Sequence, residues 1–73
     1  MGSYLKIIGQ CGVVVEISSS QITRNLYATG NRICFFNGTI IAEYDTYERT
    51  AEVWENLKQA ALEGSETFTV PKE

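Results

Sequence analysis

The sequence predicts a single α+β domain over residues 1–73: an antiparallel β-meander of about five strands, one amphipathic helix packed on one face, and a short final strand. Three observations predict this class. Asn37-Gly38 separates two apolar runs, which is the strongest short-range signal of a β-hairpin. Residues 46–63 repeat apolar positions at helical spacing, and residues 66–70 alternate with a period of two.

The first half of the chain supplies the earlier strands of the meander. Residues 5–8 and 13–17 are rich in Leu, Ile and Val, and the residues between them have the composition of a turn. Residues 18–21 are polar and predict a loop or a bulged edge. Residues 22–29 are predicted as a strand, because they contain Thr and Tyr and lead into a Gly-Asn turn.

The hairpin is formed by residues 32–36 and 39–44, which flank Asn37-Gly38. Both central residues of a type I′ turn need a positive φ, and the Asn-Gly pair tolerates this best. We therefore expect a two-residue hairpin loop at this point.

The helix has start and stop signals. Asp45 is predicted as the N-cap, and Glu48 three residues later completes a capping box, a feature that typically contributes about 1 kcal/mol. Gly64 stands where a left-handed C-terminal cap is expected. The apolar face of the helix comprises Thr50, Val53, Trp54, Leu57, Ala60 and Ala61.

A second apolar face of the sheet predicts an interface between copies of the chain. If Ile33, Phe35, Ile40, Ala42 and Tyr44 serve the core, their neighbours must point the other way. Contiguous exposed apolar patches are rare on monomers, so a homo-oligomer is expected. The alternative is a curled, barrel-like sheet that buries both sets within one chain. The residues expected at the oligomer interface are Val14, Cys34, Phe36 and Ile41.

The size and composition of the chain indicate how so small a domain could be stabilised. A 73-residue domain buries only roughly 60% of the surface that its unfolded chain exposes, so disulfides, metals or association usually help it. The chain has no His and two Cys without metal-ligand spacing, so no metal and no cofactor are expected. Cys11 and Cys34 are interpreted as free thiols in a reducing cytosol. Self-association is therefore the expected source of additional stability.

Charge and hydropathy point to a cytoplasmic protein, in the host cytosol if it is viral. The net charge of −3 argues against binding to extended nucleic acid. The chain shows neither a signal peptide nor an apolar run long enough to cross a membrane. Gly2-Ser3 is interpreted as a cloning scar.

The sequence offers no catalytic constellation, and we expect a protein that is not an enzyme. Without His, the commonest general base and the usual Ser or Cys triads are excluded. Glu43, Asp45 and Glu48 form the only carboxylate cluster, and capping already explains two of them. No glycine-rich phosphate-binding motif follows a strand.

Binding is the remaining class, and polar and aromatic groups are its candidates. An Arg side chain can hold a phosphate through two hydrogen bonds, and a Tyr ring can stack on a base. The alternative is that these are ordinary solvent-facing residues. Trp54 is interpreted as a core residue, with a ligand platform as the alternative. The predicted ligand-binding residues are Arg24, Tyr27, Arg32, Tyr47 and Arg49.

Residues 38–51, with 66–71, resemble small uncharacterised proteins of Firmicutes bacteria and their phages. Those proteins share a strand that ends in a Tyr-Asp/Ser-Thr-Glu-Glu helix start, then a helix, then an aromatic-bearing strand that ends in Pro. The resemblance covers about half of the chain and carries no activity that could be transferred residue by residue. It implies an origin in a phage or mobile element, where short oligomeric proteins often act against host defence.

We therefore expect a non-enzymatic, phage-associated binding protein that sequesters a small nucleotide signal at a subunit interface. Two alternatives remain: an inhibitor that blocks a host defence protein such as a CRISPR effector, and a structural homo-oligomerisation module.

Overall fold

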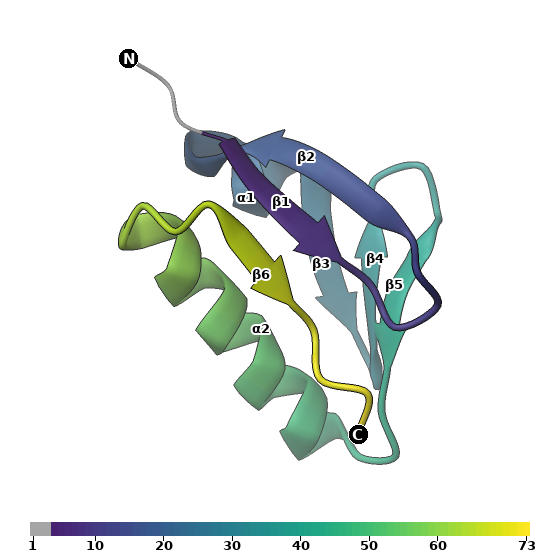
Figure 1. Ribbon diagram of the computed structural model, residues 1–73. Helices are drawn as coiled ribbons and strands as arrows, with labels where there is room; N and C mark the ends of the chain where they lie inside the picture. Colours follow the sequence, from purple (N-terminus) through teal and green to yellow (C-terminus); the bar gives the residue numbers. More distant parts are fainter. Residues whose placement is uncertain (1–3) are drawn as a thin grey trace.

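A computed structural model describes residues 4–73, and the expected cloning scar at Gly2-Ser3 lies outside the described residues. The α+β class is confirmed: six strands combine with one long and one short helix (Figure 1). In chain order the elements are β1 (Tyr4–Ile8), β2 (Val14–Ser18), the 3₁₀ turn η1 (Ser19–Gln21), α1 (Ile22–Asn25), β3 (Leu26–Thr29), β4 (Arg32–Phe35), β5 (Ile40–Glu43), α2 (Tyr47–Leu62) and β6 (Thr67–Thr69).

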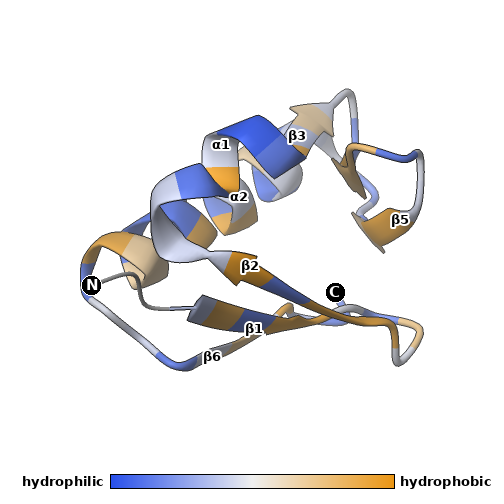
Figure 2. Cartoon of the chain, turned by 90° about the horizontal axis from the view of Figure 1, so that it is seen from above, coloured by the Kyte–Doolittle hydropathy of each residue, from blue (hydrophilic) through white to orange (hydrophobic). Residues whose placement is uncertain are grey.

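The strands form two sheets rather than one meander. Sheet A has the order β2-β1-β6 and sheet B the order β3-β4-β5. Seen from above, β1, β2 and β6 lie in one layer, while β3 and β5 lie in a second (Figure 2). β6 runs parallel to β1, with Lys6 opposite Thr67 and Ile7 opposite Phe68. The first and last strands of the described chain are therefore neighbours in sheet A.

The break between the sheets falls at residues 22–25, which we predicted as strand and which form α1. Ile22 and Leu26 are both buried, and they are four residues apart. A spacing of four fits a helical turn as well as a strand, but a strand would place Arg24 on the same buried face, and Arg24 is exposed. The chain thus turns out of sheet A and enters sheet B at β3.

The predicted hairpin is present, but its loop differs from the expected type I′ turn. Positive φ occurs at Gly38, with a value of 96°, while Asn37 has an ordinary negative φ. The Gly38 N–H donates to the Phe35 carbonyl at 2.8 Å, and the Phe35 N–H donates to the Thr39 carbonyl at 2.8 Å. These bonds enclose a three-residue loop, in which a single glycine supplies the left-handed conformation.

A β-bulge next to this loop exchanges two isoleucines between the faces of sheet B. Ile33 pairs with Ala42 and Cys34 pairs with Ile40, so Ile41 is an extra residue between the two pairs. Ile41 and Ala42 are both 1% exposed, although they are adjacent in sequence. We predicted Ile41 on the outer face and Ile40 in the core. The bulge reverses both positions, because it shifts the alternation by one residue.

The bulge is tied to the turn after β1. The Ile41 carbonyl accepts a hydrogen bond from the Gln10 N–H at 3.0 Å. Gly9 approaches so closely that an added Cβ would lie 2.8 Å from the Ile41 carbonyl oxygen. The Gln10 side chain accepts a hydrogen bond from the Glu43 N–H at 2.8 Å and donates to the Pro71 carbonyl at 3.2 Å. One turn therefore connects β1, β5 and the C-terminal segment.

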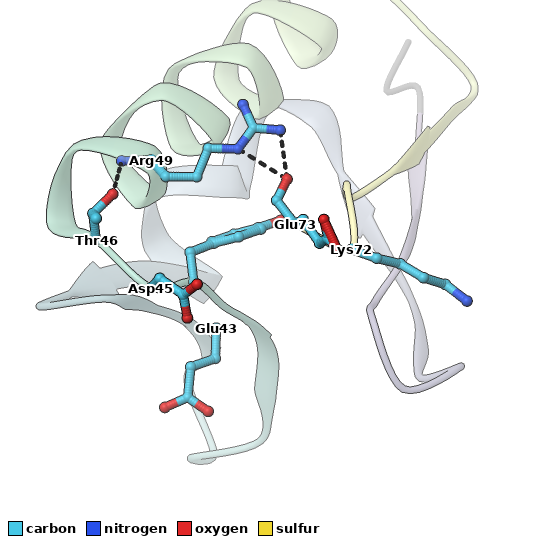
Figure 3. A pocket seen from close by; sticks show the side chains of 7 residues that line it. Glu43, Asp45, Thr46, Arg49, Lys72 and Glu73 are labelled. Carbon is cyan, nitrogen blue, oxygen red and sulfur yellow. Dashed lines mark hydrogen bonds between the residues drawn. The ribbon is translucent and has the colours of Figure 1, made fainter.

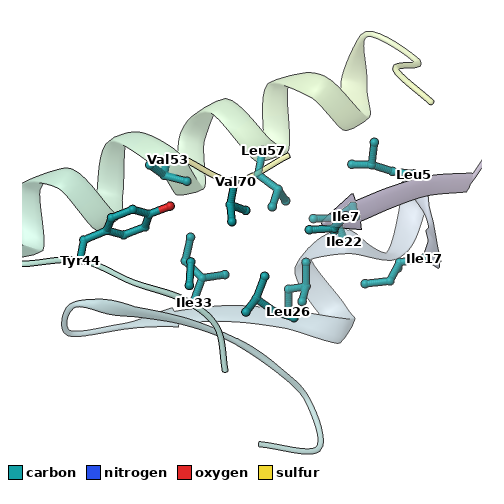
Figure 4. Packing of buried hydrophobic residues seen from close by; sticks show 12 residues of the cluster. Leu5, Ile7, Ile17, Ile22, Leu26, Ile33, Tyr44, Val53, Leu57 and Val70 are labelled. Atoms are coloured by element: carbon teal, nitrogen blue, oxygen red, sulfur yellow. The ribbon is translucent and has the colours of Figure 1, made fainter. Parts of the chain in front are cut away.

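Helix α2 closes the core. Thr46 is its N-cap instead of the predicted Asp45, and the Thr46 hydroxyl accepts a hydrogen bond from the Arg49 N–H at 3.1 Å. Gly64 follows the helix with a φ of 79°, as the sequence predicted. Val53 and Leu57 point from α2 toward side chains of both sheets (Figure 4). The buried cluster comprises Leu5, Ile7, Ile17, Ile22, Leu26, Ile33, Ile41, Ala42, Tyr44, Val53, Leu57 and Val70.

Tyr44 connects the strand-to-helix junction to the C-terminal segment. Its ring is buried, and its hydroxyl donates a hydrogen bond to the Pro71 carbonyl at 2.7 Å. Burial raises the pKa of the Tyr44 phenol above its usual value, and the nearby Arg49 guanidinium acts in the opposite direction. The neutral phenol is therefore the form that the fold stabilises.

We predict that Gly9→Ala lowers the free energy of unfolding by about 1–3 kcal/mol, because the added methyl group displaces the Ile41 carbonyl. Urea denaturation measures the loss, and hydrogen exchange of the Gln10 amide shows where it arises. Gly12→Ala is the control, because a Cβ at Gly12 meets no atom within 4 Å and strains only its own backbone. The control should leave exchange at Gln10 slow. Unchanged stability of Gly9→Ala would show that the contact is not tight.

Tyr44→Phe should destabilise the protein by about 1 kcal/mol at neutral pH, because the bond to the Pro71 carbonyl is lost. The folded-state pKa of Tyr44 is raised, so its stabilising contribution is present below pH 10 and is lost as the pH rises through the folded-state value. Urea denaturation from pH 8 to about 11 should therefore show the gap between the two proteins closing. A constant or widening gap would contradict the raised pKa.

Candidate functional site

The outer face of sheet B carries a row of apolar side chains, one from each strand. Tyr27 on β3 is opposite Cys34 on β4, and Cys34 is opposite Ile40 on β5. Tyr27 is 44% exposed and Ile40 43% exposed, while Cys34 between them is 5% exposed. Phe36 lies two residues beyond Cys34, in the hairpin loop, and is also exposed. Directly opposed side chains in a sheet lie about 5 Å apart, so the row is continuous.

Local sequence explains most of this row. Ile33 and Cys34 alternate between the inner and outer faces of β4, as the strand period requires. Ile40 joins the outer face only because of the bulge at Ile41. Ile40 is thus the site residue that sequence reasoning missed, and the alternation of the strand contained no signal for it.

A charged pair borders the apolar row. The Arg32 Nε lies 2.8 Å from the Glu43 Oε2, between the directly opposed ends of β4 and β5. Both side chains are about half exposed. The hydrogen bond to Glu43, together with its negative charge, raises the pKa of Arg32 further above its already high value. Arg32 therefore stays charged, but part of its hydrogen-bonding capacity is already used.

The five predicted ligand-binding residues lie in separate places. Tyr27 and Arg32 share the outer face of sheet B, where they are diagonal neighbours on adjacent strands. Arg24 is exposed on α1. Tyr47 is at the start of α2, beside a hollow between that helix and β3. Arg49 is in the first turn of α2 and faces the C-terminal segment (Figure 3). The structure thus brings together one pair of the five.

The predicted oligomer-interface residues are divided as well. Cys34 is on the outer face of sheet B, whereas Phe36 is exposed in the hairpin loop, where its ring centroid lies 4.7 Å from that of Phe35. Val14 is exposed on the outer face of sheet A, opposite Ile8. Ile41 is corrected from an interface position to a core position, because the bulge turns its side chain inward.

A cleft of ≈ 430 Å³ lies at the start of α2, and its charges are mixed (Figure 3). The Arg49 Nε and one terminal nitrogen donate to the Glu73 main-chain oxygen at 3.1 and 2.8 Å. Arg49 also pairs with Glu52. Lys72 points away from the Arg49 guanidinium (Figure 3). The guanidinium is therefore committed to internal partners. The lining residues are Glu43, Tyr44, Asp45, Thr46, Arg49, Lys72 and Glu73.

Within residues 4–73 we find no group of three or more His, Cys, Asp or Glu side chains placed to hold a metal ion. No helix in the same part of the chain is long and apolar enough to span a membrane.

No protein-family model matches this chain, and no curated protein or solved structure matches it either.

Proposed function

We propose that this protein is a non-enzymatic binding protein that self-associates through the outer face of sheet B. The observation that carries the proposal is the continuous row of Tyr27, Cys34 and Ile40, whose two outer members remain almost half exposed. Burying apolar surface is favourable by roughly 25 cal/mol per Å², so such a row favours association. The absence of His from the sequence supports binding over acid–base catalysis.

A second copy of the chain suits this face. The face has an apolar centre and the Arg32–Glu43 pair at its border, which is the usual arrangement of an interface core and rim. A two-fold contact would apply the same patch twice and cover both rows at once. Association would also supplement a core that is small for an independent domain.

The resemblance to phage proteins supports a role against host defence. In that role the assembled copies would block a host defence protein, such as a CRISPR effector, or sequester a small nucleotide signal. The contact face of the assembly is common to both roles.

Sequestration of a nucleotide at the subunit interface is the second candidate function, and one observation favours it. Tyr27 and Arg32 are diagonal neighbours on the face that the copies would share. A Tyr ring can stack on a base while the Arg side chain holds a phosphate. The Arg32 guanidinium would have to exchange the Glu43 carboxylate for the phosphate.

Ile40→Lys should convert the self-associated protein into a monomer, because each copy would bring an unpaired charge into the apolar row. Light scattering coupled to size-exclusion chromatography, from about 1 to about 100 µM protein, measures the mass across the range of a micromolar association. Val14→Lys is the matched control, since Val14 is an exposed apolar strand residue on the other sheet. A wild-type monomer at every concentration, or an Ile40→Lys variant that still associates, would contradict the proposed interface.

For the nucleotide candidate, we predict that cyclic di-AMP or ADP-ribose raises the melting temperature and that Arg32→Ala abolishes the rise. Ligand at a concentration of about 100 Kd adds about 2.7 kcal/mol of stability. Glu43→Gln should strengthen the effect, because it frees the guanidinium and removes a negative charge from the phosphate site. Arg24→Ala, on α1, is the control and should respond like wild type. A rise that survives Arg32→Ala would place the ligand elsewhere.

A further inference from the structure

A groove runs along α2 on the side that faces β3 and α1. Two hollows of ≈ 320 and ≈ 250 Å³ lie in line, and Lys58 lines both of them. We call this surface the α2 groove. The first hollow is lined by Ala28, Gly30, Tyr47, Thr50, Ala51, Trp54, Glu55 and Lys58, and the second by Ser19, Ser20, Ile22, Thr23, Lys58, Ala61 and Leu62.

The first hollow includes an open strand edge. β3 is an edge strand of sheet B, and the Phe36 N–H donates to the Asn25 carbonyl at 2.8 Å. In an antiparallel pair, alternate residues direct their main-chain groups at the partner strand. Tyr27 therefore faces β4 with its main chain, while Ala28 turns its N–H and carbonyl to the open edge. These main-chain groups are a template for one more strand.

The side chains of α2 that border the groove have a regular spacing. Trp54, Lys58 and Leu62 are four residues apart on the helix, so successive members are separated by about 6 Å along its axis. In an extended chain, side chains on one face repeat every two residues, or about 6.6 Å. Three alternate side chains of an extended segment would therefore meet Trp54, Lys58 and Leu62 in turn.

The charges of the groove indicate which type of side chain the incoming segment would place opposite Lys58. The Lys58 ammonium lies 5.6 Å from the Trp54 ring centroid and pairs with Glu55 at 2.6 Å. The Glu55 side chain is 68% exposed and that of Lys58 is 33% exposed. Glu55 can turn into solvent, whereas the Lys58 ammonium lies over the Trp54 ring. An incoming carboxylate could therefore take the place of Glu55.

From these features we propose that the α2 groove binds an extended segment of another protein, which adds as a strand to the open edge of β3. The segment carries an acidic residue with apolar residues two places before and two places after it. Its main chain pairs with Ala28, its acidic side chain meets Lys58, and its apolar side chains enter the two hollows. This is the strand-addition mode of peptide recognition, with pockets for alternate side chains.

A different protein, rather than a second copy, supplies this segment. Among residues 4–73, no strand contains an acidic residue with apolar residues two places on either side. Tyr27 and Ala28 point to opposite faces of β3, so the α2 groove is distinct from the proposed contact between copies. The two proposals can therefore fail independently.

Trp54 is the single tryptophan of the chain, so its fluorescence reports directly on the groove. The probe is the acetylated and amidated peptide Thr-Leu-Thr-Glu-Thr-Leu-Thr, titrated to about 1 mM to cover weak peptide affinities. We expect a saturable change in emission. Replacing the Glu of the peptide by Lys should weaken binding at least about tenfold, because two ammonium groups would then meet.

A charge exchange provides the sharpest comparison. Lys58→Glu should lose affinity for the Glu peptide and gain affinity for the Lys peptide. Lys6→Glu is the matched control, because it makes the same charge change on the outer face of sheet A and should leave both affinities unchanged. A peptide methylated on its main-chain nitrogens should bind more weakly, since strand addition needs those donors.

Three outcomes would overturn the proposal. The first is the lack of a saturable change with the Glu peptide. The second is a Lys58→Glu variant that keeps the wild-type preference. The third is an emission that depends on protein concentration without peptide and ceases to do so in Lys58→Glu, which would place a second copy in the groove. Equal binding of the methylated peptide would overturn strand addition specifically.

Discussion

The rest of the structure depends on the contact between the turn after β1 and the bulged carbonyl of Ile41. Across residues 4–73 no strand of sheet A pairs with a strand of sheet B, so the two sheets are held together by packing and by contacts of this kind. Gly9 permits the approach, the Gln10 N–H binds the carbonyl, and the Gln10 side chain reaches both Glu43 and Pro71. A buried carbonyl that has left its ladder needs such a donor. The same bulge decides that Ile40, and not Ile41, faces outward.

β3 relates the two proposed binding surfaces to each other. Its four residues alternate between an outer face, where Tyr27 joins the apolar row, and an inner face, where Ala28 borders the α2 groove. The small side chain of Ala28 leaves the first hollow unfilled, and the position of β3 at the end of sheet B leaves its main chain open. Helix α2 covers the core through Val53 and Leu57, so its flank is left to border the groove. One short strand thus contributes to both the outer face of sheet B and the α2 groove, and the two surfaces do not overlap.

The sequence was sufficient to predict the elements that depend only on residues close to each other in the chain. The helix followed from its apolar period, and Gly64 marked its end, because these depend on neighbouring residues alone. Thr46 replaced Asp45 as the cap, which is a shift within the usual uncertainty of helix ends. The bulge at Ile41 could not be predicted, since Gln10, which donates a hydrogen bond to the bulged carbonyl, is far away in sequence. The ligand candidates were chosen by residue type alone. Residue type does not predict that Arg32 forms an ion pair with Glu43 or that Arg49 donates to the C-terminal segment.

Cys34 gives the outer face of sheet B a property that packing alone does not suggest. Its sulfur lies between Tyr27 and Ile40 and is almost inaccessible, while the second free thiol, Cys11, is exposed. A thiol reagent therefore modifies Cys11 directly but reaches Cys34 only when the strands around it separate. The rate of Cys34 modification, divided by that of Cys11, therefore measures how often this part of the sheet opens locally. Cys11 serves as the reference within the same molecule. Binding of another chain to that face should therefore change the rate at which Cys34 is modified.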